Sequence, residues 1–233
     1  PLDGYFDELE EETAVVIPIA GLADETHTLF VRAVDSAGNI SAASTRTFVV
    51  DRAPPIVSDE RIEPSPTNID PMVSAKIADE TSGVEDSEFY IDLEGNPPYG
   101  FGIPMAPAGG PFYWAMIDIL ELDGDGIHFV WMRSRDKAGN ASGFTIIPFL
   151  VDMTPPAFVR LEVLPGYTNG TSNPRITAEI VDEWVGIESV EYYAGKQAPR
   201  GVYGTGTPLV AGANNVYSSD IEVSSLDEGW YGV

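Results

Sequence analysis

Carboxylates are the side chains of this sequence that are best placed to do chemistry. The 233 residues include 37 Asp and Glu against 12 Lys and Arg, which gives a formal net charge of −25. Several acidic residues stand beside short β-rich runs and are candidate metal ligands: Asp51, Asp79, Glu80, Asp136, Asp152, Asp182 and Glu183. Clustered carboxylate oxygens suit Ca²⁺, with backbone carbonyls and water completing the coordination. Whether these side chains meet depends on the elements that carry them.

Other kinds of catalytic chemistry have little support. The two histidines, His27 and His128, lie 101 positions apart, and there is no cysteine, so neither a nucleophilic triad nor a zinc site is indicated. Counting residues leaves open the paired carboxylates of a glycosidase, because acidic residues occur throughout. A repeated module rarely hosts chemistry in each copy, so we expect no enzymatic activity.

The net charge indicates which classes of partner are disfavoured, and the N-terminus and one uncharged run bear on a signal peptide and a membrane span. A charge of −25 disfavours nucleic acid and anionic membranes, and attracts cations. No signal peptide is visible and the sequence begins at Pro1, as expected of an internal segment. The uncharged run over residues 99–117 is interrupted by Pro and Gly, which favours a loop leading into a strand over a membrane-spanning helix.

A domain-length repeat organises the chain. The segment Asp35-Ser36-Ala37-Gly38-Asn39 returns as Asp136-Lys137-Ala138-Gly139-Asn140, at an offset of 136 − 35 = 101. Phe-x-Val-Asp followed by Pro-Pro recurs at the same offset, and a two-residue insertion after Asn169 moves the later matches to 103. The predicted domains are residues 1–53, the C-terminal half of one repeat; 54–153, a complete repeat; and 154–233, the N-terminal part of a third.

The complete repeat is predicted to be all-β. Short runs with a period of two, separated by turn residues, predict strands at residues 56–62, 72–78, 84–92, 99–103, 112–120, 128–134 and 144–151. The Asp-x-Ala-Gly-Asn segment is predicted to be the turn of a hairpin, with glycine supplying a positive φ. About 100 residues of this kind favour an antiparallel β-sandwich.

These motifs resemble a known family. Asp-x-Ala-Gly-Asn-x-Ser, Phe-x-Val-Asp and Pro-Pro, preceded by Asp-Glu-x-x-Gly, resemble the bacterial and archaeal immunoglobulin-like repeats found in tandem in large adhesins, surface-layer proteins and stalks of secreted enzymes. The resemblance implies that the second-to-third strand loop, the last hairpin loop and the incoming linker share one pole. It places Asp79 and Glu80, Asp136, and Asp51 there, so interdomain calcium is expected at this junction, and Asp152, Asp182 and Glu183 are expected at the next.

The calcium prediction has an alternative, because Asp is also an ordinary turn residue. The turn over residues 122–126 resembles the start of a calcium loop but lacks the downstream ligand spacing, which favours a tight turn. Three glycosylation sequons occur, at Asn39, Asn140 and Asn169.

Aromatic residues gather where the copies diverge: Tyr99, Phe101, Phe112, Tyr113 and Trp114. They are candidate contacts for a sugar or a protein, or they close the end of a small core.

The sequence therefore predicts a non-catalytic extracellular segment, a rod-like array of repeats acting as spacer, adhesin stalk or surface-layer element. Its partners would be neighbouring repeats of the same chain and a cell-surface protein or glycan. An alternative is an accessory module of a large secreted hydrolase. A third is a self-assembling subunit in which half-repeats of two molecules complete one another by strand complementation.

Overall fold

A computed structural model describes residues 12–195, 203–224 and 226. The predicted all-β class is confirmed: the described residues form antiparallel strands and one short 3₁₀ helix, η1 (Ile119–Glu121). Parts of the two outer predicted repeats, residues 1–11, 196–202, 225 and 227–233, lie outside this description. No described helix is long and apolar enough to cross a membrane.

Contacts divide the chain into two units, of which the first is residues 1–63, 71–117 and 128–149. The repeat boundaries at 53/54 and 153/154 follow the sequence offset and stay a prediction. In the first unit, β1 (Glu25–Val31) and β2 (Ser44–Val50) pair antiparallel as a hairpin, with Glu25 opposite Val50 and Val31 opposite Ser44. Asp35 accepts hydrogen bonds from the backbone N–H groups of Ala37 and Asn39 in the turn. The predicted hairpin is therefore present.

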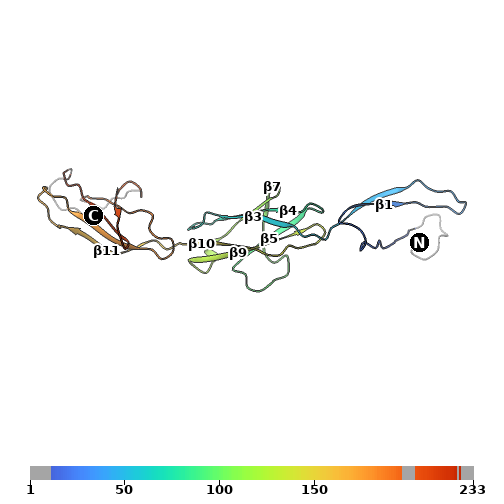
Figure 1. Ribbon diagram of the computed structural model, residues 1–233, viewed down its shortest axis with the longest axis horizontal. Coiled ribbons are helices and arrows are strands. Elements are labelled where there is room, and N and C mark those ends of the chain that lie inside the picture. The colour runs from blue at the N-terminus through green and yellow to red at the C-terminus, as the bar shows by residue number, and fades with distance from the viewer. Residues whose placement is uncertain (1–11, 196–202, 225, 227–233) are drawn as a thin grey trace. The chain divides into compact units, whose positions relative to one another are not determined.

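Two four-stranded sheets form the main body of the first unit (Figure 1). One has the order β3 (Ile56–Glu63), β4 (Met72–Ala78), β8 (Phe112–Met116), β7 (Ala106–Gly109). The other has the order β10 (Thr145–Val151), β9 (Gly126–Asp136), β5 (Val84–Ile91), β6 (Ile103–Pro104). The core forms from alternate residues of these strands, as a period of two requires. Deeply buried apolar residues of the first unit are Val73, Ala75, Ile77, Phe89, Val130, Met132 and Phe149.

The predicted strand over residues 112–120 is too long. It ends at Met116, and η1 follows, because Asp118 caps the turn by accepting a hydrogen bond from the Leu120 N–H at 3.0 Å. Asp70 also accepts a hydrogen bond from the Ile119 N–H. The run of residues 99–117 is a loop with three short strands, β6, β7 and β8.

The second unit, residues 64–70, 118–127 and 150–233, has its own core. Its sheets are β11 (Ala157–Leu164), β12 (Arg175–Val181), β16 (Val216–Asp220), β15 (Val210–Ala211), and the pair β13 (Glu191–Tyr192) and β14 (Thr207–Pro208). The buried residues of this core are Ile176, Ala178, Ile180, Val190, Tyr192, Leu209 and Ile221.

Candidate metal centre and the loop-anchoring network

Three of the predicted metal ligands lie together in the first unit. Asp51 follows β2, Asp79 follows β4 and Asp136 ends β9. One carboxylate oxygen from each lies within 4.8 Å of the others. Asp136 is 1% exposed and Asp51 9%, and Asp79 is half-buried, so two of the three residues are largely removed from water. Neighbouring carboxylates in such a place repel one another by roughly 3–4 kcal/mol per pair at an effective dielectric constant of about 20.

Each carboxylate of the cluster also holds a turn. Asp79 Oδ1 accepts hydrogen bonds from the N–H groups of residues 81, 82 and 83. Asp136 accepts from the backbone and side-chain nitrogens of Asn140, both at 2.8 Å. Asp51 accepts from the N–H groups of Ala53 and Ser82. These donors stabilise the charged forms without a cation, and they leave further lone pairs for one.

The pKa of Asp51 is lowered from its ordinary value. A hydrogen bond from the Ser82 side chain is the largest cause, and it outweighs burial, which acts in the opposite direction. Lys137 lies beside the same turn, since its Nζ is 3.5 Å from where a Cβ on Gly83 would stand. The hydrogen bonds to Asp51 thus favour its ionised form.

The other predicted ligands do not join a described cluster of three acidic groups. Glu80 is exposed and outside the group. Asp152 and Asp182 repeat the turn contacts of Asp51 and Asp79: Asp152 Oδ1 accepts from the Thr154 N–H, and Asp182 Oδ1 accepts from the N–H groups of residues 184, 185 and 186. That these two and Glu183 bind calcium stays a prediction.

Asp125 lies in the turn over residues 122–126, which resembles the start of a calcium loop. Its carboxylate binds the linker at residues 153 and 154, within the second unit. Its carboxylate accepts hydrogen bonds from the Met153 N–H at 2.7 Å and the Thr154 hydroxyl at 2.5 Å. The Thr154 hydroxyl is the main reason that the pKa of Asp125 lies below its ordinary value. Asp24 makes the corresponding contacts with Arg52 in the preceding copy.

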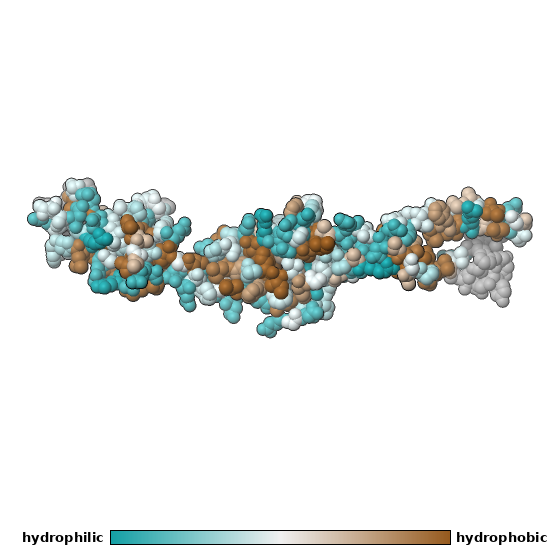
Figure 2. Space-filling model, viewed as in Figure 1, coloured by the Kyte–Doolittle hydropathy of each residue, from teal (hydrophilic) through white to brown (hydrophobic). Residues whose placement is uncertain are grey.

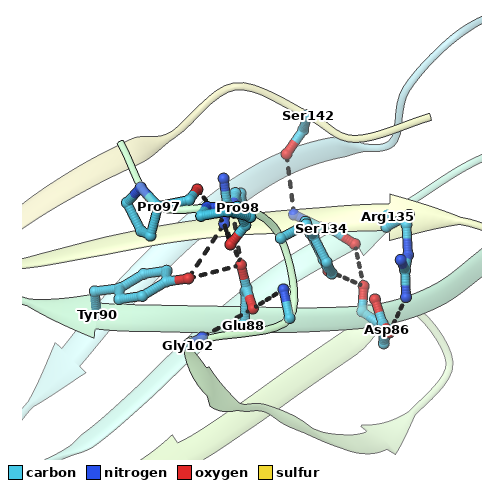
Figure 3. A network of polar contacts seen from close by, with 12 residues as sticks. Asp86, Glu88, Tyr90, Pro97, Pro98, Gly102, Ser134, Arg135 and Ser142 are labelled. Atoms are coloured by element: carbon cyan, nitrogen blue, oxygen red, sulfur yellow. Dashed lines mark hydrogen bonds and ion pairs between the residues drawn. The ribbon is translucent and has the colours of Figure 1, made fainter. Parts of the chain in front are cut away.

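A second polar network was missed by sequence reasoning (Figure 3). Glu88, on β5, is 4% exposed, and its carboxylate accepts hydrogen bonds from the Gly100 N–H at 2.8 Å and the Gly102 N–H at 3.0 Å. It also accepts from Tyr90 Oη and from Arg133 Nε, at 2.7 Å for the latter. Burial alone would raise the pKa of Glu88, but these four donors outweigh it and lower the pKa.

Arg133, on β9, completes the network. Its Nη2 donates to the backbone carbonyls of Pro97 and Pro98, and its guanidinium lies 5.0 Å from the Tyr99 ring centroid and 4.6 Å from that of Phe144. Glu88 and Arg133 thus bind neighbouring parts of the loop over residues 92–104, Arg133 at residues 97 and 98 and Glu88 at residues 100 and 102. The network fixes the loop on the outer side of its sheet.

The glutamate of this network has a counterpart in the second unit. Glu191 corresponds to Glu88 at the offset of 191 − 88 = 103. Its carboxylate accepts from the N–H groups of Gly204 and Gly206, each at 2.9 Å, and from Tyr193 Oη. The sequence signal was present as Glu-x-Tyr followed by Gly-x-Gly in both copies.

The predicted ligand-contact aromatics have different surroundings. The ring of Tyr99 packs against the guanidinium groups of Arg133 and Arg135. Its hydroxyl donates a hydrogen bond to the Asp86 carbonyl at 3.1 Å, and burial raises the pKa of this hydroxyl. Tyr113 is half-buried. Phe101 and Trp114 are exposed, at 75% and 39%. On the face seen in Figure 2, hydrophobic residues form groups among hydrophilic ones. Whether Phe101 and Trp114 contact a ligand stays a prediction.

Both histidines have structural partners. His128 is 6% exposed, and its Nδ1 lies 2.6 Å from Asp92 Oδ2. The ring of His128 also packs on Phe149, with the centroids 5.7 Å apart. His27 Nε2 lies 2.9 Å from the Ala23 carbonyl and its ring stacks on Phe48. Both positions therefore serve the packing of a hairpin.

The second unit contains an apolar cavity of about 240 Å³, lined by Phe158, Leu161, Ile176, Ala178, Val190, Glu191, Tyr192, Tyr193 and Leu209. Sites for small molecules usually measure roughly 300–1,000 Å³ and combine apolar walls with a few polar groups. Glu191 is the acidic residue of this lining, and its carboxylate already binds Gly204 and Gly206. The cavity therefore offers little for catalysis.

The chain resembles a solved structure. No model of a known protein family matches the chain, and no curated protein matches it. A solved structure is similar over 90% of this chain, with 19% sequence identity and a TM-score of 0.39. It is described as the crystal structure of a tetra-tandem repeat in the extending region of a large adhesion protein. This chain covers 52% of that structure, or about half its length.

Proposed function

We propose that this chain is a non-catalytic structural segment of a cell-surface protein, in which tandem immunoglobulin-like repeats act as a spacer or adhesin stalk. One observation carries the proposal: the acidic side chains that accept several backbone hydrogen bonds in one copy recur in the next copy and make the same kind of contact there. Asp79 and Asp182 hold the same kind of turn, and Glu88 and Glu191 hold the same kind of loop.

The chemistry of these contacts supports a structural role. A catalytic carboxylate needs an oxygen that can reach a substrate, whereas Glu88 is buried with four donors around it. Hydrogen bonds that recur in successive copies stabilise a module independently of any one ligand. A polypeptide built from such modules maintains its shape without requiring an occupied site.

We further propose that the Asp51–Asp79–Asp136 cluster binds Ca²⁺. Three carboxylate oxygens within 4.8 Å of one another suit a hard cation that takes oxygen ligands, with backbone carbonyls and water as the remaining ligands. Asp51 immediately precedes the segment Arg52-Ala53-Pro54-Pro55, so an ion would restrain the start of that segment against the two loops. The ion would also offset the repulsion among the three carboxylates.

Isothermal titration calorimetry with CaCl₂ at low salt tests the calcium site. The wild-type chain should give a saturable heat, and Asp136→Asn should abolish or greatly weaken it. Asp123→Asn is the matched control, because it removes the same charge at an exposed residue outside the cluster. Absence of saturable heat in the wild type, or equal binding by Asp136→Asn, would show that these carboxylates serve the turns alone.

A further inference from the structure

The three glycosylation sequons of this chain differ in whether their Asn amide nitrogen is already hydrogen-bonded. Transfer of an N-linked glycan requires the carboxamide nitrogen of Asn and a hydroxyl two residues later, on an accessible segment. The sequons are Asn39-Ile40-Ser41, Asn140-Ala141-Ser142 and Asn169-Gly170-Thr171. The structure separates them into two classes.

The reacting groups of the sequon at Asn140 are hydrogen-bonded within its hairpin. Asn140 Nδ2 donates to Asp136 Oδ2 at 2.8 Å and to the Asp51 carbonyl at 3.1 Å. Ser142 Oγ accepts from the Ser134 N–H at 3.0 Å and donates to the Gly143 carbonyl. Neither reacting group is available unless the turn opens.

The sequon at Asn39 repeats this arrangement. Asn39 Nδ2 donates to Asp35 Oδ2 at 2.8 Å, and Ser41 Oγ accepts from the Ala33 N–H and donates to the Ala42 carbonyl. Asn39 is exposed, so exposure alone does not distinguish it. Its amide and hydroxyl are nevertheless occupied within the hairpin.

The sequon at Asn169 is arranged differently. Asn169 lies in the exposed loop between β11 and β12, and its Oδ1 accepts from the Thr171 N–H at 3.1 Å and the Thr171 hydroxyl at 2.6 Å. Among the described residues, its Nδ2 has no hydrogen-bond partner. The hydroxyl required by the motif therefore orients the carboxamide while leaving its nitrogen open to solvent.

The same stretch of the preceding copy is packed. There, Thr67 is 5% exposed, its N–H donates to the Leu150 carbonyl, and its own carbonyl accepts from the Asp152 N–H. In the third copy the stretch has the two-residue insertion, and the residues from 168 to 173 are exposed. Asn169 matches Asn68 of the preceding copy, but the residues after it differ, and Asn68-Ile69-Asp70 is not a sequon.

We propose that Asn169 is the site at which the folded chain accepts an N-linked glycan, and that Asn39 and Asn140 are not acceptors. The donor class is a glycan on a polyisoprenyl diphosphate. Asn169 Nδ2 forms a bond to the anomeric carbon, and the bond from that carbon to the diphosphate oxygen breaks. The lipid diphosphate leaves with the electron pair, and one amide proton passes to a base of the transferring enzyme. In the cell this rests on the proposed surface location.

The test is transfer in vitro to the purified, folded chain. The enzyme is an oligosaccharyltransferase chosen because it accepts three synthetic peptides, residues 34–45, 135–146 and 164–175, so each sequon is competent when unfolded. Intact mass and glycopeptide mapping should show one glycan, at Asn169. Modification at Asn140 should be slower by about tenfold or more, because its amide must first leave its hydrogen bonds.

Substitutions within the sequons provide controls for this test. Asn169→Gln and Thr171→Ala should abolish the modification, while Thr171→Ser and Asn140→Gln should retain it. The inference is overturned if the folded chain is modified at Asn39 or Asn140 as fast as at Asn169, or if Asn169 is unmodified. Because the assay requires no cell, its failure is separate from failure of the proposed surface role.

Discussion

Glu88 and Arg133, 45 positions apart in sequence, lie side by side on neighbouring strands, with Arg133 Nη2 2.6 Å from Glu88 Oε1. Each is at most 7% exposed, and each binds backbone groups of the loop over residues 92–104. A buried ion pair adds little net stability over an apolar pair, but removing one partner leaves an uncompensated charge. The pair therefore determines where the loop lies more than how stable the sheet is.

Removing the carboxylate should be strongly destabilising. Glu88→Ala leaves Arg133 buried and two glycine N–H groups without acceptors, so we expect a loss of about 3–5 kcal/mol in the free energy of unfolding. Denaturant titration followed by tryptophan fluorescence measures it. The control is Arg160→Ala, which breaks an exposed pair with Glu162 and should cost at most about 1 kcal/mol. The double variant Glu88→Met with Arg133→Met should cost less than the two single changes together, and simple additivity would contradict the account.

The same pair should make stability depend on pH. The pKa of Glu88 is lower in the folded chain than its ordinary value of 4.5. Its stabilising contribution is therefore fully present above that value and is lost as the pH falls through the folded pKa. The difference in unfolding free energy between the wild type and Glu88→Gln should shrink as the pH falls below 4.5. A difference that is constant from pH 7 to pH 3 would contradict this prediction.

Close packing at Gly102 gives an independent test of the loop. A Cβ there would lie 2.9 Å from Glu88 Cβ, 2.9 Å from a Tyr90 ring atom and 3.0 Å from the Phe89 carbonyl oxygen. Gly102→Ala should therefore destabilise the first unit by about 1–3 kcal/mol, as overpacking does. Gly143→Ala, with no atom within 4 Å of its Cβ position, should have little effect in the same thermal melt. Equal melting temperatures for the two variants would show that the loop moves away freely.

The sequence predicted the parts of this structure that depend on local patterns. The Asp35-to-Asn39 turn and the strand at residues 72–78 are present because turn chemistry and a period of two act between near neighbours. The Glu88–Arg133 pair was not predicted, because its members come from different strands and charged residues usually lie on the surface. Similarly, the resemblance to immunoglobulin-like repeats implied that Asp51, Asp79, Glu80 and Asp136 share one pole, but Glu80 lies outside the cluster of the other three.

If calcium binds at the Asp51 cluster, it should raise stability by mass action. At a free Ca²⁺ concentration about 100 times the dissociation constant, the expected gain is about 2.7 kcal/mol. Calorimetric melts in Ca²⁺ and in chelator at equal ionic strength measure this gain. Asp136→Asn should lose the calcium-dependent part while Asp123→Asn keeps it. A rise in melting temperature that is equal in Asp136→Asn and the wild type would indicate general charge screening.

Small-angle X-ray scattering of the whole chain, in Ca²⁺ and in chelator at matched ionic strength, tests the central claim most directly. A calcium-stiffened spacer predicts an elongated particle whose scattering shows greater flexibility when calcium is removed. The variant Asp136→Asn should scatter in Ca²⁺ as the wild type does in chelator. A wild-type profile that is the same with and without calcium would contradict the claim and leave Asp51, Asp79 and Asp136 with their roles in the turns.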